Sequence, residues 1–579
     1  MRERIAVRLM SAIVLATGLL VTACRDNPLA VNNRQNPDVS KAYASPANVE
    51  AIVSKLFQQN WNGQHNTSDN VHTQTITISF ESSSQLGNFG MGARGAIPRN
   101  LIDNTIGNAV ATGNFRDFDN MTRIARSATN AIAAIDRFKT AVPTVSIGSP
   151  ARDARAKAWA YFQLGYGTGQ LALFYDSAAI ITPKTPVDPS APGAIPDLSP
   201  ASAVGAYALE ALDSALAISN SAAATTGTNG WPIPADWISD PSTTGMTLTR
   251  FQQVVNSYKA KFRAGVARTP TERAAVDWTK VIAEATAGIT ADFVVQANTT
   301  TGWGSSWQQQ MRVSSGWSQM TPMILGMGDT TGAYDNWLAT PLLQRSPNGR
   351  PTPFSVPGQA DEDKGIMRTP DKRFPSGETR AAQNLVTGNT KGGTPAGSIL
   401  YFRNRPVGED TPADTWGTWY YDNWREWAIG AGGGNGNYPL FTVAENDMLA
   451  AEGYLRTNQV ALAAPLIDKT RVRAGLLPVV GITDLTTPVP GINKCVPRVP
   501  QPPNYTSTAC GNIFEAMKWE KRLETSFTGY GQWFIDSRGW GDLVVGSPLE
   551  WPVPYQELFA RQKASYTNQR AATRGTYGF

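Results

Sequence analysis

The sequence predicts a mostly α-helical fold in which paired helices form a helical-repeat scaffold that carries a large irregular, loop-rich insertion. Apolar residues recur at helical spacing in several blocks, and long segments without this period separate the blocks. Glycine and proline number 52 and 39 of 579 residues, which is roughly 16% of the chain against a usual ~12%. With 41% hydrophobic and 17% charged residues, the composition indicates a folded protein rather than a disordered one.

The N-terminus has the organisation of a secretion signal. Basic residues extend to Arg8, an uncharged run too short to span a bilayer with ease follows, and small residues precede Cys24. The sequence Val21-Thr22-Ala23-Cys24 resembles a bacterial lipobox, in which the cysteine is acylated before cleavage. We therefore predict a lipoprotein signal peptide at 1–23 and lipidation of Cys24. The alternative is an ordinary secretory signal with an incidental cysteine.

A polar segment separates the predicted anchor from the body of the protein. Residues 24–45 contain asparagine and proline without an apolar period, and we expect them to form a lipidated tether. Residues 46–579 form a single body in this interpretation. Several acyl chains, each stabilised by ~0.8 kcal/mol per buried CH₂ group, would hold the protein durably on a membrane outside the cytoplasm.

The two remaining cysteines, Cys495 and Cys510, flank a proline-rich loop in which we expect no secondary structure. In an oxidising compartment an even pair favours a disulfide, and closing a loop of this length contributes about 3 kcal/mol in the chain-entropy model. Two unrelated free thiols are the alternative. A metal site is disfavoured because no further cysteine or histidine lies nearby.

The helical blocks follow in order along the body. A first helix is predicted over 47–60, after the start signal Ser45-Pro46. The glycine- and serine-rich run 82–95 is expected to lack regular structure and to lie over a binding face. Helix pairs are expected over about 115–290 and 441–528. The individual blocks are about 115–139, 151–175, 201–219, 248–264, 272–289, 441–456, 459–473 and 512–528.

The insertion 291–440 is poor in helical pattern and rich in tryptophan. It contains eight of the seventeen tryptophans, and long irregular segments in compact proteins are usually functional. We expect the ligand face here, with help from the run 82–95. Core packing at the junction with the helices is the alternative for each ring. The predicted stacking platforms are, first, Trp303, Trp307 and Trp317, and then Trp416 and Trp419.

Catalytic and nucleic-acid-binding patterns are largely missing from the sequence. It contains no G-x-S-x-G, P-loop or H-E-x-x-H motif, and it has two histidines, His65 and His72. The run 361–363, Asp-Glu-Asp, could supply an acid pair or oxygen ligands for Ca²⁺, although a solvated loop is the simpler interpretation. A net charge of +5 without a basic run disfavours nucleic acid as a partner. We expect no cofactor and no metal.

Two C-terminal stretches carry a family resemblance. The helix pair over 441–473 has two Ala-Glu pairs and ends in Arg-Val-Arg-Ala-Gly at 471–475. Residues 519–558 contain Glu520, Arg522-Leu523-Glu524, Gly529, Trp533-Phe534, Asp536-Ser537-Arg538-Gly539-Trp540-Gly541 and Trp551-Pro552-Val553-Pro554. With Asp371-Lys372-Arg373 and the lipobox, these motifs resemble the SusD/RagB family of nutrient-binding lipoproteins. The resemblance implies a SusD-like, tetratricopeptide-like scaffold.

The motif residues are interpreted as structural. Ala516, Trp519, Leu523 and Phe527 share one apolar stripe, which leaves Glu520, Arg522 and Glu524 to pair with neighbouring elements. Buried pairs of this kind determine register more than they supply stability. We do not expect them to be catalytic.

The resemblance implies a function as well as a fold. It implies a surface-facing outer-membrane lipoprotein that binds oligosaccharides or other nutrient oligomers and delivers them to a TonB-dependent transporter of the SusC type. Aromatic rings suit this role because they cover the apolar faces of sugars. Two alternatives stay open. The first is an extracytoplasmic glycan-degrading hydrolase, which needs only two carboxylates at a suitable separation, and the second is a purely structural docking protein.

Overall fold

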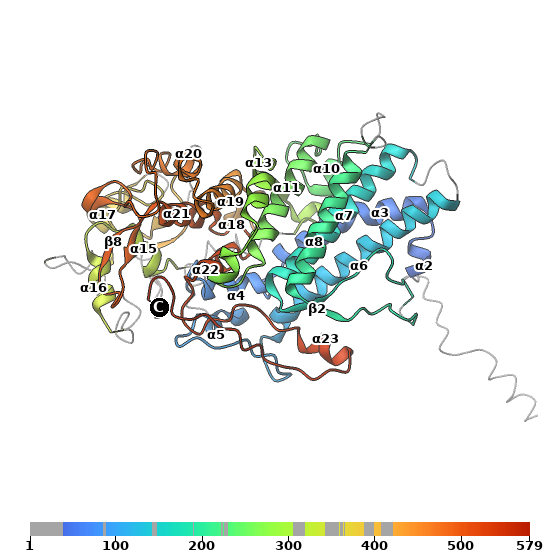
Figure 1. The fold of residues 1–579 in the computed structure, drawn as a ribbon, viewed down its shortest axis with the longest axis horizontal. Helices are drawn as coiled ribbons and strands as arrows, with labels where there is room; N and C mark the ends of the chain where they lie inside the picture. Colours follow the sequence, from blue (N-terminus) through green and yellow to red (C-terminus); the bar gives the residue numbers. More distant parts are fainter. Residues whose placement is uncertain are drawn as a thin grey trace, which may run out of the picture.

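The computed structural model describes residues 39–84, 88–141, 147–188, 190–221, 224, 230–304, 319–341, 358, 363, 365–386, 399–406, 421–425 and 427–578. Its longer helices pack side by side in one half of the molecule, and short helices and strands fill the other (Figure 1). The prediction of a mostly helical fold is confirmed. The predicted Cys24 and the signal peptide 1–23 lie outside the described residues, as does most of the tether 24–45.

The predicted helical blocks correspond to the main helices of the structure. Most of them pack on their neighbours in the order of the chain, so that the array runs from the first helix to the C-terminal motifs. These helices are α3 (Pro46–His65), α6 (Ala111–Ala141), α7 (Pro150–Phe174), α8 (Ala201–Ser219), α11 (Leu248–Gly265), α12 (Pro270–Ala274), α13 (Trp278–Thr286), α19 (Val443–Arg456), α20 (Val460–Arg471) and α21 (Ile513–Thr525). The shorter ones are α2 (Val39–Ala42), α4 (Val71–Ile78), α5 (Met91–Gly95), α10 (Ala235–Ile238), α15 (Pro322–Gly328), α16 (Ala333–Ala339), α17 (Arg380–Asn384), α18 (Trp427–Ala431), α22 (Gln532–Trp540) and α23 (Tyr555–Ala560).

Helix α7 shows how the sequence builds the array. Ser149 caps its first turn by accepting a hydrogen bond from the Arg152 backbone N–H, and Pro150 occupies the first helical position. Gly165 allows α8 to approach closely, because a Cβ atom there would lie 2.7 Å from the Leu212 side chain. By length and composition, α8 is also the one helix in the described part of the chain able to cross a membrane. It packs on α7 and α11 with one face and leaves the opposite face exposed, as a helix at the surface of the array.

The helix pair α19 and α20 begins and ends where the sequence signals predict. Thr442 caps α19 by accepting a hydrogen bond from the backbone N–H of Glu445. Asn458 takes a left-handed conformation, with φ of 58°, in the turn between the two helices. Gly475 follows α20 with φ of 79°, as the predicted C-terminal stop requires.

Short strands of the described residues pair two by two, and all four pairs are antiparallel. The pairing of β3 with β6 joins the beginning of the insertion to its end. The pairs are β1 (Ser177–Ala179) with β2 (Leu198–Pro200), β3 (Phe293–Ala297) with β6 (Gly436–Phe441), β4 (Phe402–Asn404) with β5 (Tyr421–Asn423), and β7 (Arg498–Pro500) with β8 (Thr508–Cys510).

The glycine- and serine-rich run 82–95 differs from the expectation. We predicted no regular structure there, but residues 88–90 form a 3-10 turn and Met91–Gly95 form α5. Burial of Met91 against Ile76 and Phe527 stabilises this short helix. Long-range packing therefore overrides the weak helix propensity of its glycines.

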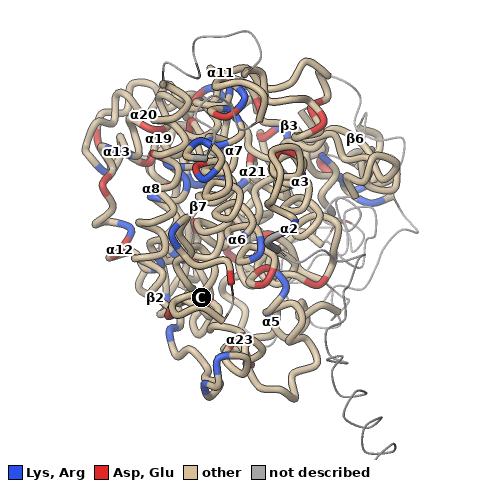
Figure 2. Tube along the Cα trace, turned by 90° about the vertical axis from the view of Figure 1, so that its right-hand side faces the viewer, with Lys and Arg blue, Asp and Glu red and all other residues tan. Residues whose placement is uncertain are grey.

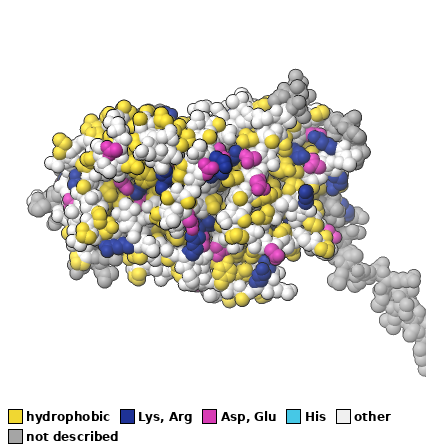
Figure 3. Space-filling view, in the orientation of Figure 1, with side chains coloured by type: hydrophobic (Ala, Val, Ile, Leu, Met, Phe, Trp, Pro, Cys, Tyr) yellow, Lys and Arg dark blue, Asp and Glu magenta, His cyan; other side chains and the backbone are white. Residues whose placement is uncertain are grey.

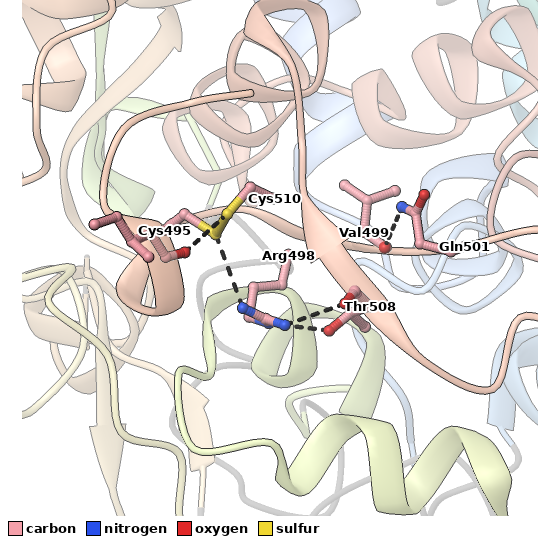
Figure 4. Close-up of a disulfide and its surroundings, with 7 residues drawn as sticks. Cys495, Arg498, Val499, Gln501, Thr508 and Cys510 are labelled. Atoms are coloured by element: carbon pink, nitrogen blue, oxygen red, sulfur yellow. Dashed lines mark hydrogen bonds between the residues drawn. A yellow bond between two sulfur atoms is a disulfide. The ribbon is translucent and has the colours of Figure 1, made fainter. Parts of the chain in front are cut away.

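Cys495 and Cys510 form a disulfide, with the two Cα atoms 5.7 Å apart (Figure 4). The loop between them is not structureless as expected, because β7 and β8 pair across it. The Arg498 guanidinium reinforces the hairpin by donating hydrogen bonds to the Thr508 side chain at 2.9 Å and to its carbonyl oxygen at 3.1 Å. The disulfide therefore closes a small β-hairpin beside α21.

A buried ionic network joins the insertion to α21. Arg373 of the Asp-Lys-Arg motif donates to Asp371 at 2.7 Å and to Glu520 at 2.8 Å, and it lies 3.3 Å from Glu524. All four side chains are almost fully buried. Burial would raise the pKa of Glu524, but the guanidinium groups of Arg425 and Arg373 lower it instead. The motif is thus a structural contact, in agreement with the sequence interpretation.

A second buried network connects the C-terminal helices. Arg273 of α12 donates to Glu452 of α19 at 2.6 Å and to Asp536 of α22 at 3.0 Å. Lys521 of α21 lies 2.9 Å from the same Asp536 carboxylate. The second Ala-Glu pair and the Asp-Ser-Arg motif, far apart in the sequence, therefore meet in one cluster. Such paired charges fix the relative positions of the helices that carry them.

Candidate functional site

The structure joins the two segments that were predicted to form a ligand face. Ser83 and Gln319 exchange backbone hydrogen bonds of 2.8 and 2.9 Å, and the Thr321 hydroxyl donates to the carbonyl oxygen of Phe80 at 3.0 Å. We call this contact, formed by residues 80–84 and 319–321, the junction. The junction holds residues 80–84 against the insertion at a point that follows Trp317 by two residues in the sequence.

The junction is itself packed into the protein. Ser82, Ser83 and Gln319 are buried, and Phe80 and Met320 belong to a core cluster of the insertion half. These side chains therefore form a base rather than an exposed surface. Any ligand contact near the junction must come from the segments that flank this base.

Trp303 corrects one of the predictions. Its ring is 3% exposed and packs among Phe57, at 5.8 Å, and Trp61, at 6.4 Å between ring centroids. A backbone pair with Asn298 holds it there. The position is one of core packing, the alternative that the sequence left open, so we do not propose Trp303 as a stacking platform.

The other predicted platforms, Trp307, Trp317, Trp416 and Trp419, lie outside the described residues. Among the described tryptophans of the insertion, Trp337 and Trp424 are fully buried, and Trp427 is partly exposed. Trp427 packs on Trp424 at 5.0 Å, and the Arg403 guanidinium covers the Trp424 ring at 3.8 Å. The ranking from the sequence omitted Trp427, because density of tryptophan does not distinguish an accessible ring from a buried one.

A buried polar cluster supports the helix that leads to the junction. Asp117 accepts hydrogen bonds from the backbone N–H of Val71, at 2.7 Å, and from the Tyr530 hydroxyl, at 2.9 Å. His72 stacks on Tyr530 at 4.9 Å and accepts a hydrogen bond from the backbone N–H of Gly531. Helix α4, which runs from Val71 toward Phe80, is thereby held at its first turn by a carboxylate, the charge that a helix N-terminus favours.

Burial raises the pKa of Asp117, and the hydrogen bonds from Val71 and Tyr530 lower it. The effect of burial is the larger one, so the pKa is about 6. A carboxyl group whose pKa is raised on folding stabilises the protein below its unfolded pKa, and this contribution is lost as the pH rises through about 6. Relative to Asp117→Asn, which cannot titrate, the wild-type free energy of unfolding should fall by about 2–4 kcal/mol between pH 4 and pH 7. Urea unfolding at both pH values measures this difference, and a pH-independent difference would contradict the raised pKa.

The structure describes both histidines and one residue of the acidic run that were candidates for catalysis. His65 and His72 are both 1% exposed, and His65 stacks on Trp61 at 4.3 Å. Neither can act on a substrate at the surface from these positions. Asp363 accepts a hydrogen bond from the backbone N–H of Arg380, while the two residues before it lie outside the described part. Within the described ranges, no group of three or more acidic, histidine or cysteine side chains could hold a metal ion.

The chain is similar to solved structures of SusD-like proteins. A SusD homologue from Parabacteroides distasonis is 14% identical, with a TM-score of 0.48 and 84% of each chain covered. A laminarin-binding SusD-like protein is 13% identical, with a TM-score of 0.45 over 91% of this chain and 98% of that one. Surface glycan-binding protein A from Bacteroides uniformis is 12% identical, with a TM-score of 0.44 over 90% and 99%. No protein-family model and no curated protein matches the sequence. The solved structures to which the chain is similar thus include members of the family that its motifs resemble.

Proposed function

We propose that the protein is a lipid-anchored, surface-facing outer-membrane protein. In this proposal it binds glycans or other nutrient oligomers and delivers them to a TonB-dependent transporter. The lipobox and the SusD/RagB motifs support the proposal from the sequence. The observation that carries it in the structure is the role of the motif residues: they hold the tryptophan-rich insertion to the helical array instead of forming an open catalytic site.

The arrangement suits binding by stacking. The insertion is fixed at three places: the junction, the Arg373 network and the pairing of β3 with β6. Rigid support lowers the entropic cost of holding aromatic rings for a ligand. Tryptophan rings cover the apolar faces of sugars, while neighbouring amide and hydroxyl groups satisfy their hydroxyls.

The hydrolase alternative would need two accessible carboxylates. Among the close carboxylate pairs of the described residues, Asp176 and Glu550 share the Asn568 amide, which donates to them at 2.9 and 2.8 Å. Burial raises the pKa of Asp176, as a general acid would require. However, Glu550 is buried and paired with Arg268 and Arg570. This observation favours a structural role for the pair.

Single substitutions test the binding face. Changing Trp307, Trp317, Trp416, Trp419 or Trp427 to Ala should weaken oligosaccharide binding by about 1–3 kcal/mol where the ring is a platform, with little change in melting temperature. Trp303→Ala is the matched control, because a core ring of this size stabilises the fold by about 3–5 kcal/mol. Calorimetric titration and thermal unfolding give both quantities. Loss of stability without loss of affinity in all five variants would contradict the proposed face.

A further inference from the structure

An apolar surface lies beside helix α23. Phe559 is 81% exposed and Ile195 is 64% exposed, and the residues next to them in sequence, Ala560 and Pro196, line one pocket of about 490 Å³. The Arg561 side chain fastens α23 to this surface by donating to the carbonyl oxygen of Pro196 at 2.8 Å. Figure 3 shows hydrophobic side chains gathered at the lower edge of the molecule, where Figure 1 places α23. We call Ile195, Phe559 and this pocket the α23 surface.

Together, the exposed Phe559 ring, Ile195 and the pocket offer a contiguous apolar area for contact with a membrane or a protein. The exposed phenyl ring is not held by the core, since its neighbour on the helix, Leu558, is the buried residue of α23. Phe559 therefore contributes little to folding and is available for contact with something outside the chain.

The α23 surface lies at the end of the body that the anchor reaches. Ser127 of α6 lines the pocket, and its carbonyl oxygen accepts a hydrogen bond from the hydroxyl of Tyr43, the residue that follows α2. Figure 2 shows α2 beside α6, with α23 below them. Fourteen residues separate Cys24 from Val39, the first residue of α2. An unstructured chain of this length spans about 20 Å on average, and any chain of this length reaches about 50 Å when fully extended.

Basic side chains surround the apolar residues. Arg123, Arg126 and Arg561 line the pocket together with Glu557; Arg123 pairs with Asp119 at 2.9 Å and Arg561 with Glu557 at 2.6 Å. Arg126 donates to the carbonyl oxygens of Pro186 and Ala194, and its guanidinium is not paired with a carboxylate in the bonds described. An aromatic ring flanked by arginines is the composition of protein surfaces that lie in the interface of a bilayer.

We propose that the α23 surface docks on the lipid bilayer that holds the anchor, with Phe559 and Ile195 among the headgroups and the arginines near their phosphates. This inference rests on the proposed lipidation of Cys24, because the tether confines the body to the vicinity of the membrane. The docking would orient the molecule, with the end that carries α2 and α23 toward the lipid.

Unlipidated protein separates this proposal from the anchor itself. The Cys24→Ala chain leaves no free thiol, because Cys495 and Cys510 are paired. A solvatochromic dye can therefore be attached at Phe559→Cys alone, with Leu385→Cys, 86% exposed and far away in the insertion half, as the matched control. Vesicles of phosphatidylcholine and phosphatidylglycerol in equal parts should shift the dye emission to the blue at position 559 and leave it unchanged at 385.

Flotation with the same vesicles gives the second readout. Phe559→Ser should lower the bound fraction by about tenfold, and Leu385→Ser should not change it. Neither exposed substitution should alter the melting temperature. Equal dye responses at both positions, or vesicle binding that is unaffected by Phe559→Ser, would overturn the proposal. An effect of Phe559→Ser on a protein partner without any vesicle binding would also overturn it, in favour of a protein interface. Failure of Cys24 lipidation is detected separately, by mass spectrometry of the mature chain.

Discussion

Replacing Arg373 by methionine should lower the free energy of unfolding by about 3–5 kcal/mol. The substitution leaves three buried carboxylates, Asp371, Glu520 and Glu524, without their shared cation. Methionine fills much of the volume but cannot supply the donated hydrogen bonds, and unpaired buried charge is among the most costly defects in a folded protein. Urea unfolding followed by circular dichroism measures the loss.

Lys280→Met is the matched control for this substitution. Lys280 pairs with Asp277 at 3.2 Å, but its side chain is 64% exposed, and surface pairs contribute about 0–1 kcal/mol. If Arg373→Met costs no more than Lys280→Met, the motif does not hold the insertion to the array. Because Arg373 connects the insertion to α21, its loss should also weaken ligand binding. A destabilising substitution in α8, which does not contact the insertion through this network, should weaken ligand binding less.

Cys24→Ala should release the protein from the membrane, with its fold intact. Acylation requires the cysteine thiol, and no other part of the chain is predicted to insert permanently. The α23 surface alone gives reversible binding that is lost on dilution, because exposed aromatic contacts hold a protein far more weakly than several acyl chains. Fractionation followed by an alkaline wash, which strips peripheral partners, measures the change.

The double variant Cys495→Ala, Cys510→Ala is the matched control for the anchor. It should stay in the membrane fraction but lose about 3 kcal/mol of stability in the chain-entropy model. Retention of Cys24→Ala in the washed membrane fraction would contradict lipidation at this residue.

The sequence predicted the helical array because its helices are long and carry strong local signals. Ser45-Pro46 before α3, Asn458 in the turn and Gly475 after α20 are start and stop signals that act within a few residues. The apolar period of α7 extends over 25 residues, so single exceptions do not obscure it. Local signals of this kind suffice even for α7, which α3, α6, α8 and α11 bury on most sides.

The sequence did not predict the elements that depend on distant contacts. Helix α4 is rich in valine, threonine and isoleucine, which favour strands, and it is stabilised by Asn70 at its N-cap and by Asp117 from α6. The β7–β8 hairpin lies in a proline-rich segment whose composition indicates a loop. In each case a partner far away in the sequence decides the structure.

The candidate site could be predicted to a segment but not to a residue. The insertion and the run 82–95 do meet, through Ser83 and Gln319. A segment rich in tryptophan, however, contains both buried and exposed rings. Trp303 and Trp424 are buried, and Trp427 is partly exposed. Which ring faces outward depends on how the insertion folds on α3 and on α21, and composition does not encode this.

Titration of the purified chain with a panel of oligosaccharides tests whether it captures glycans. Tryptophan emission reports binding, and a reducing-end assay on the same samples reports cleavage. We expect a saturable change in emission with at least one oligosaccharide and no new reducing ends. New reducing ends would identify a hydrolase, and an unchanged emission across the panel would identify a structural docking protein. Either result would contradict the capture of intact oligosaccharides.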